Sequence, residues 1–301
     1  MFRAALILVT ALSAQDMTSP VVDPRLTAVL SRPATPSLIS EMDRLAAEGV
    51  PGADAMHRGF VALTSGSAGP NWAGACPIWE AASSTSAEAA HFTAECVEHG
   101  HDRPADPERA AELYRLAGEG GFPKSLCALG NLYMAGRGVP NDPVRAADLC
   151  RRGAEMGDAD AQTDLANFYL SGRGMPEDKV EARRWYERAA EQNQRNALYT
   201  LGQMYWNGDT VEKDNDEAAR LWRLAYEAGR RDAALPLARA AMVKAMADRN
   251  NPDAETLRDA QRWFAIAIPR ILDGVEKAEA EQQLALVRRL LALLAERAAA
   301  S

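Results

Sequence analysis

The chain has 301 residues, of which 47% are hydrophobic and 25% are charged, and its formal net charge at pH 7 is -8. This acidic balance argues against a nucleic-acid-binding protein, which usually carries a stripe of Lys and Arg. No cluster of basic residues adjoins an apolar segment in the way that would hold a chain on anionic lipid. We therefore expect a soluble protein with no stable membrane insertion after its N-terminal signal is cleaved.

Residues 1–14 have the features of a cleavable export signal. Residues 1–3 are a short basic start, residues 4–12 are apolar, and residues 11–14 offer small side chains for cleavage. The apolar stretch is much shorter than the roughly 20 residues that span a bilayer. We therefore predict an exported bacterial protein, periplasmic or secreted. The alternatives are an uncleaved anchor, or a frayed first helix in a cytoplasmic protein with reduced cysteines.

Residues 15–35 are predicted to be a flexible lead-in, since prolines recur along them. Residues 36–104 are predicted to hold degenerate repeats. The run Arg-Leu-Ala-Ala-Glu-Gly at 44–49 resembles Arg-Leu-Ala-Gly-Glu-Gly at 115–120, within the better-formed repeats.

Residues 105–236 repeat with a period of 36. Leu-Gly-Asn-Leu-Tyr at 129–133 returns as Leu-Ala-Asn-Phe-Tyr at 165–169 and as Leu-Gly-Gln-Met-Tyr at 201–205. A fixed period of this size indicates stacked supersecondary units that cannot bury their apolar faces alone. Each unit is predicted to be a helix that ends at glycine, followed by a second helix that begins at a capping aspartate. The predicted caps are Asp142, Asp178 and Asp214.

Residues 237–301 are predicted to be a further degenerate repeat and C-terminal capping helices. Asn250, Asn251 and Pro252 indicate a longer turn, and residues 275–299 form an Ala/Leu/Glu/Arg-rich helix interrupted by charges. Terminal repeats need such a solubilising cap.

The four cysteines suit an oxidising compartment. Cys127 and Cys150 lie nearly symmetrically about one inter-helix turn, and Cys76 and Cys96 lie likewise about a turn near residues 84–86. Positions of this kind face each other in an antiparallel helix pair. We therefore predict the disulfides Cys76–Cys96 and Cys127–Cys150, with four buried free thiols as the alternative.

The Leu-Gly-x-x-Tyr helix, the Gly-x-Gly turn, the Asp cap and the Ala-x-x-Trp/Tyr-x-x-Ala-Ala helix resemble Sel1-like repeats, relatives of tetratricopeptide repeats. The resemblance implies an all-α right-handed solenoid of about five helix pairs that acts as a non-enzymatic adaptor for protein complexes or signalling, here in the cell envelope. Weak β-lactam binding has been attributed to cysteine-rich secreted members, which makes binding or hydrolysis of cell-wall-like ligands the alternative. Those members carry a Cys-seven-residues-Cys pattern that this chain lacks.

In stacked helix pairs the first helices line the concave face, so polar residues at equivalent positions of these helices should form a ladder there. Residues three or four apart share one stripe of a helix. An amide ladder could hydrogen-bond the backbone of an extended peptide, with aromatic side chains as anchors. The alternative is a merely solvated or packing role. The predicted contact residues are Asn131, Asp164, Asn167, Tyr199, Thr200, Gln203 and Trp206.

Few residues suggest a metal site or a catalytic site. The cluster Cys96, His99, His101 and Asp102 contains potential metal ligands, but it occupies a diverged repeat turn, and Cys96 has a better partner. His91 is interpreted as a packing or surface residue, and no base with an orienting third group stands out for nucleophilic catalysis. No nucleotide-binding motif is present. We predict no metal, no cofactor and no catalytic residue.

Overall fold

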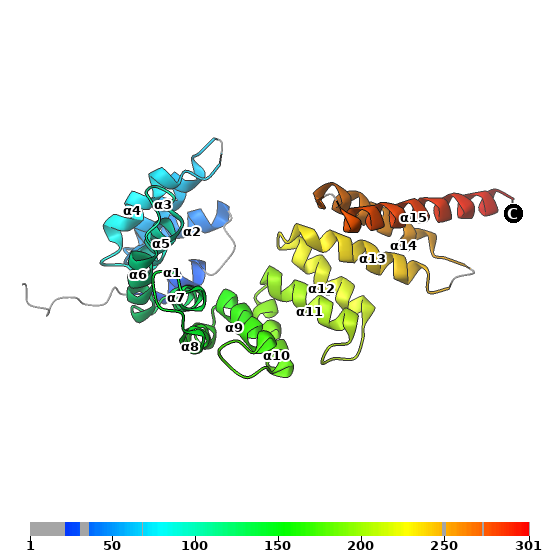
Figure 1. Cartoon of the computed structure of the whole chain (residues 1–301). Coiled ribbons are helices and arrows are strands. Elements are labelled where there is room, and N and C mark those ends of the chain that lie inside the picture. The colour runs from blue at the N-terminus through cyan, green and yellow to red at the C-terminus, as the bar shows by residue number, and fades with distance from the viewer. Residues whose placement is uncertain (1–21, 31–35, 68, 249–250, 273, 301) are drawn as a thin grey trace, which may run out of the picture. The chain divides into compact units, whose positions relative to one another are not determined.

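The computed structural model describes residues 22–30, 36–67, 69–248, 251–272 and 274–300, and the regular secondary structure in these ranges is helical (Figure 1). The helices are α1 (Pro24–Leu30), α2 (Pro36–Ala47), α3 (Ala53–Thr64), α4 (Trp72–Ala82), α5 (Ala87–His99), α6 (Pro107–Glu119), α7 (Pro123–Ala135), α8 (Pro143–Glu155), α9 (Ala159–Ser171), α10 (Lys179–Glu191), α11 (Arg195–Asn207), α12 (Asn215–Glu227), η1 (Arg231–Ala233), α13 (Ala234–Ala245), α14 (Ala254–Ala267), η2 (Ile268–Arg270) and α15 (Val275–Ala300). Consecutive helices pack on each other as tandem pairs from α1 to α6 and from α8 to α15. The predicted all-α repeat fold is therefore confirmed.

The chain divides into two compact units, which meet in sequence between Ser125 and Leu126. The predicted signal at residues 1–14 lies outside the described residues. Among the residues that are described, no helix is long and apolar enough to cross a membrane.

The first unit is built around a buried aromatic cluster. Trp79 of α4 is fully buried, and its ring lies 5.6 Å from that of Phe60 and 5.1 Å from that of Phe92. The disulfide between Cys76 and Cys96 joins α4 to α5 inside the same core. This pairing is the predicted one.

Part of the segment predicted to be a flexible lead-in is a packed helix instead. In α1, Leu26 is fully buried and Val29 is 2% exposed, and both belong to the core of the first unit. Thr27 Oγ1 donates a hydrogen bond to Glu88 Oε1 of α5 at 3.4 Å. The prediction for residues 24–30 was wrong, because burial of these apolar side chains outweighs the local bias of the surrounding prolines.

The second unit shows the predicted helix boundaries. Asp142, Asp178 and Asp214 each precede a second helix and accept hydrogen bonds from backbone amides of its first turn, at 2.9–3.0 Å. These bonds satisfy amides that have no partner within the helix. Gly136 and Gly172 end first helices with φ of 65° and 62°, a region that side chains with a Cβ rarely adopt.

Each first helix packs closely on the second helix that follows it. A Cβ added at Gly202 of α11 would lie 2.5 Å from Nε1 of Trp222 on α12. The Trp222 ring is 3% exposed, and its Nε1 donates to the carbonyl oxygen of Tyr199 at 3.1 Å. The missing side chain at position 202 therefore makes room for the largest side chain of the facing helix.

The C-terminal helices close the second unit. Phe264 of α14 and Val287 of α15 are fully buried in a core shared with α13. Leu286 and Leu293 of α15 are 45% and 47% exposed. The 26-residue helix α15 thus buries one face and presents the other to solvent, as expected for a terminal cap.

Candidate functional site

The three amide side chains of the predicted ladder are exposed at equivalent positions of successive first helices. Asn131 lies on α7, Asn167 on α9 and Gln203 on α11, and all three are solvent-exposed. Their spacing follows from the 36-residue period, which returns each position to the same face of the next first helix.

A polar hollow of about 410 Å³ adjoins α9 and α11. Its lining includes the predicted residues Asp164, Asn167 and Thr200. The hydroxyl of Tyr186 on α10 donates to Oδ1 of Asn167, which fixes the orientation of that amide. Burial, and then the charge of Asp164, raise the pKa of Tyr186 to about 12, so this phenol keeps its proton. The full lining of the polar hollow is Asp160, Thr163, Asp164, Asn167, Gln194, Asn196, Thr200 and Arg230.

A larger aromatic hollow, of about 780 Å³, lies between α11 and the C-terminal helices. Three predicted residues of α11 line it, Tyr199, Gln203 and Trp206. The opposite wall contains Arg231, Arg239 and Arg270, the carboxylates Asp232 and Glu276, and the apolar residues Leu235, Ile271, Leu272 and Val275. Two adjoining first helices thus gather six of the seven predicted contact residues into two hollows.

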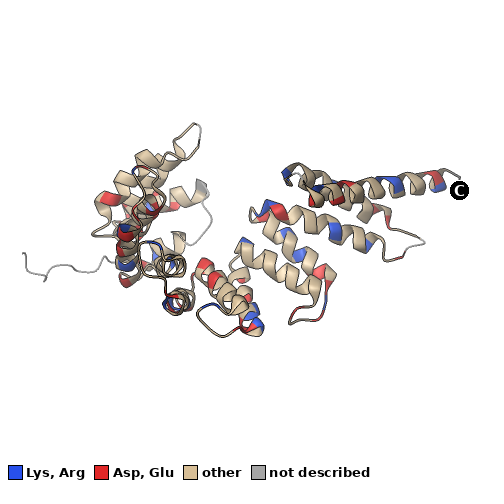
Figure 2. Ribbon diagram, in the orientation of Figure 1, with Lys and Arg blue, Asp and Glu red and all other residues tan. Residues whose placement is uncertain are grey.

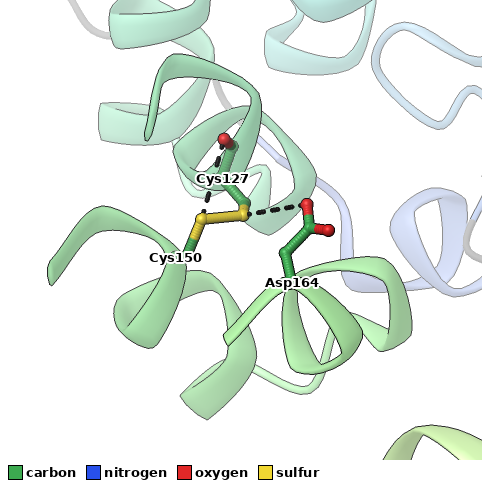
Figure 3. A group of neighbouring side chains, drawn as sticks. All are labelled: Cys127, Cys150 and Asp164. Carbon is green, nitrogen blue, oxygen red and sulfur yellow. Dashed lines mark hydrogen bonds between the residues drawn. A yellow bond between two sulfur atoms is a disulfide. The ribbon is translucent and has the colours of Figure 1, made fainter. Parts of the chain in front are cut away.

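The seventh predicted residue, Asn131, lines neither hollow but is hydrogen-bonded to Asp164, which lines the polar hollow. Its Nδ2 donates to Oδ2 of Asp164 at 3.2 Å. Asp164 in turn points from α9 toward the disulfide between Cys127 and Cys150, which is the second predicted pairing (Figure 3). Oδ2 of Asp164 lies 3.3 Å from Sγ of Cys127. A disulfide sulfur has no hydrogen to donate, so this contact is a hydrogen bond only when Asp164 carries the proton.

Cys127, Cys150 and Asp164 also form the one set of three potential metal ligands that lie close together within the described ranges. Both sulfurs are consumed in the disulfide, whereas a thiolate is the form that binds metal. The oxidised protein therefore has no three-ligand site here.

The environment of Asp164 disfavours its charged form. Burial raises the pKa of this carboxyl group, the charges of Asp160 and Asp158 raise it further, and the amides of Asn131 and Asn167 only partly compensate. The pKa of Asp164 is therefore higher in the folded than in the unfolded state, so protonation of Asp164 stabilises the folded state. This contribution to the free energy of unfolding is fully present below the pKa of the unfolded state, and it is lost as pH rises through the pKa of the folded state.

We expect Asp164→Asn to raise the stability of the second unit at neutral pH and to have little effect near pH 3, where wild-type Asp164 is protonated and resembles asparagine. The free energy of unfolding of both proteins, measured by urea denaturation from pH 3 to pH 7, should diverge as pH rises. Asp148→Asn on α8, where the side chain is 54% exposed, makes the same charge change without the burial. A difference that is independent of pH, or equal in the control, would contradict this assignment.

The residues considered for a metal site in the first unit have other contacts. The His101 ring stacks on Trp72 with centroids 3.9 Å apart, and Asp102 accepts two hydrogen bonds from Arg103, at 3.0 and 2.8 Å. Arg103 also binds both carboxylate oxygens of Glu80 on α4, at 3.1 and 2.7 Å. This turn is therefore held against α4 by stacking and ion pairs.

One polar cluster of the first unit was not anticipated from the sequence. His91 Nδ1 lies 2.9 Å from Oγ of Ser125, and its Nε2 lies 3.4 Å from Oε1 of Glu95. Burial alone would raise the pKa of Glu95, but the hydrogen bond and charge of His91 lower it, with help from Lys124 and His99. His91 is 1% exposed and Ser125 is fully buried. His91 and Ser125 are thus packed in the interior of the first unit, whereas the side chain of Glu95 is 30% exposed.

The arginines of the aromatic hollow were also missed. Arg231 belongs to η1 and Arg270 to η2, beyond the point where the 36-residue pattern fades. Lys and Arg are interspersed with Asp and Glu along the described helices, so the local excess at the hollow does not stand out in the overall charge (Figure 2). In the sequence, the adjacent arginines at 230–231 were the one feature that could have indicated a local concentration of positive charge.

Comparison with known proteins identifies the repeats. The family model of the Sel1 repeat matches residues 87–122, 123–158, 159–194 and 195–229. No curated protein matches the chain by sequence. A Sel1 repeat protein from Oxalobacter formigenes is similar in structure with a TM-score of 0.56 and 21% identity, over 84% of this chain and 99% of that one. A protective antigen of uropathogenic Escherichia coli with an SLR fold has a TM-score of 0.55 and 20% identity, over 83% of this chain. This chain spans 59% of the length of that antigen. At these identities the similarity supports the fold alone.

Proposed function

Because the chain is a Sel1-repeat protein, we propose that it is a non-enzymatic scaffold that binds a peptide segment of a protein partner along α9, α11 and the C-terminal helices. Sel1 repeats generally mediate protein–protein interactions and form non-catalytic scaffolds. The observation that carries the proposal is that two adjoining hollows, of about 410 and 780 Å³, are lined by six residues selected for their position in the repeat.

The composition of the hollows suits peptide binding. Asn167, Thr200 and Gln203 offer donors and acceptors for a peptide backbone, while Tyr199 and Trp206 offer aromatic surface for side chains. These groups stand on packed helices, so little ordering is needed on binding. Serine, cysteine and histidine are absent from the linings of both hollows. Neither hollow therefore offers the usual nucleophile and base for β-lactam hydrolysis.

We further propose that the protein works in the periplasm or outside the cell, as an adaptor or regulator of an envelope complex. Two disulfides suit an oxidising compartment. The predicted export signal at residues 1–14 agrees with this location.

The double variant Asn167→Arg/Gln203→Arg places one long cationic side chain in each hollow. We expect capture of the partner from an envelope extract of the source organism to fall by about tenfold or more, which corresponds to a loss of about 1.4 kcal/mol of binding free energy. Quantitative mass spectrometry of proteins retained on the immobilised chain measures this.

Val180→Arg is the matched control, because Val180 lies on α10, is 45% exposed and lines neither hollow. Unchanged melting temperatures would show that all variants are folded. Equal retention of the same partner by the double variant would remove the two hollows from the proposal.

A further inference from the structure

A single stacked pair of side chains separates the two hollows. Tyr199 lines the aromatic hollow and Arg230 lines the polar hollow. The guanidinium of Arg230 lies over the ring of Tyr199, 4.1 Å from its centroid. One extended ligand can therefore occupy both hollows by passing over this pair.

Acidic side chains outnumber basic ones in the polar hollow. Two carboxylates, Asp160 and Asp164, line it with one guanidinium, that of Arg230. Nη1 of Arg230 is bound to Asn196 at 2.6 Å, and its Nη2 pairs with Asp232, which lines the other hollow, at 3.1 Å. Asp160 accepts a hydrogen bond from the amide of Gln194 and Asp164 one from the amide of Asn131, and both donors are neutral groups. Burial, followed by the charges of Asp160 and Asp158, raises the pKa of Asp164, and a basic side chain in the hollow would favour the charged form of this carboxyl group.

The aromatic hollow has the opposite balance. Three arginines line it with two carboxylates. Asp232 pairs with Arg230, and Arg239 pairs at 3.8 Å with Glu279, which lies outside the lining, so Arg231 and Arg270 remain with Glu276. Arg231 donates to the carbonyl oxygen of Tyr226 at 3.4 Å, and Arg270 donates to that of Ile266. Backbone carbonyls are neutral, so these two guanidinium groups keep their charge in the hollow. Leu272, which is 90% exposed, and Val275, which is 77% exposed, add apolar surface beside them.

Resting on the proposed function, we infer that the ligand is an extended peptide carrying one basic and one acidic group. A Lys or Arg side chain enters the polar hollow, and an Asp or Glu side chain or a chain-terminal carboxylate enters the aromatic hollow. Helices pack about 8–10 Å apart, and an extended chain advances about 3.1–3.4 Å per residue. Hollows on neighbouring first helices therefore select opposite charges about two or three residues apart.

The test uses a displayed library of random dodecapeptides, selected in parallel on the wild-type chain and two neutralised variants. We expect the wild-type pool to be enriched in peptides with opposite charges about two or three residues apart. Asp160→Asn/Asp164→Asn should remove only the requirement for the basic residue, and Arg231→Gln/Arg270→Gln only that for the acidic one. Synthetic peptides from the wild-type pool should bind each variant about tenfold more weakly, since a hydrogen bond to a charged group is lost. Asp148→Asn/Arg151→Gln on α8 makes matched neutral substitutions away from both hollows and should bind as wild type does.

The outcomes separate the two proposals. If the wild-type chain enriches no peptide, both the proposed peptide-binding function and the inferred pair of opposite charges in the ligand are refuted. A second outcome is that the enriched peptides fail to bind Asn167→Arg/Gln203→Arg but carry no pair of opposite charges, or charges of one sign only. Peptide binding in the two hollows is then supported, and the inferred pair of opposite charges is overturned. Enrichment of opposite charges that persists in both neutralised variants would also overturn it.

Discussion

Replacing Cys76 and Cys96 with alanine is expected to lower the free energy of unfolding of the first unit by about 3 kcal/mol or more. The two residues are 20 apart in sequence, and closing a loop of that size removes about 3 kcal/mol of chain entropy from the unfolded state. Both side chains are 1% exposed within the core around Trp79, so their loss also removes packed apolar volume. Guanidinium denaturation followed by circular dichroism measures the change.

The second disulfide is the internal control. Cys127 and Cys150 are 23 apart, so the entropic effect of replacing them with alanine is nearly the same, about 3 kcal/mol. A difference between the two pairs therefore reports the local packing around each. Reducing agent should destabilise the wild-type chain and leave the variant without cysteines unchanged. Wild-type protein with four free thiols in non-reducing mass spectrometry would refute both pairings.

Trp222→Ala is expected to cost about 3–5 kcal/mol in the second unit. The ring is 3% exposed, and its loss leaves the carbonyl oxygen of Tyr199 without the indole donor. Since Trp222 also lines the aromatic hollow, peptide binding should weaken even where the unit remains folded. Thermal unfolding and titration with a selected peptide give the two effects separately.

Gly202→Ala tests the same contact from the other helix. The added methyl group would lie 2.5 Å from the indole nitrogen, and overpacking of this kind costs about 1–3 kcal/mol. One repeat earlier the equivalent positions hold Ala166 and Tyr186, so alanine is accepted opposite a smaller ring. Gly202→Ala combined with Trp222→Tyr should therefore be more stable than Gly202→Ala alone. If Gly202→Ala leaves the free energy of unfolding unchanged, the packing of Gly202 against Trp222 is not tight.

The repeat period explains why the helix boundaries and first-helix surface were predictable. Caps such as Asp178 and helix-ending glycines such as Gly172 act locally, and each recurs in neighbouring units. The disulfides followed from the same register, since antiparallel helices bring positions equally far from a turn face to face. Six of the predicted contact residues line hollows because a 36-residue step preserves the exposed stripe.

The features that escaped prediction depend on contacts without a repeat. Helix α1 is held by burial of Leu26 and Val29, which the prolines in the surrounding sequence obscure. The three arginines of the aromatic hollow lie on η1, α13 and η2, where the 36-residue register has faded. Their approach to α11 is set by the packing of α13, α14 and α15, which no local pattern encodes.

The two disulfides join neighbours in the order of the cysteines, first with second and third with fourth. If the chain is exported N-terminus first, as we propose, Cys76 meets Cys96 before Cys127 emerges. Oxidation in order of emergence therefore gives the native pairing, with no need for an isomerase to reshuffle it. Residues 151–301 contain no cysteine, so the helices that line the two hollows can fold against a segment whose disulfides have already formed.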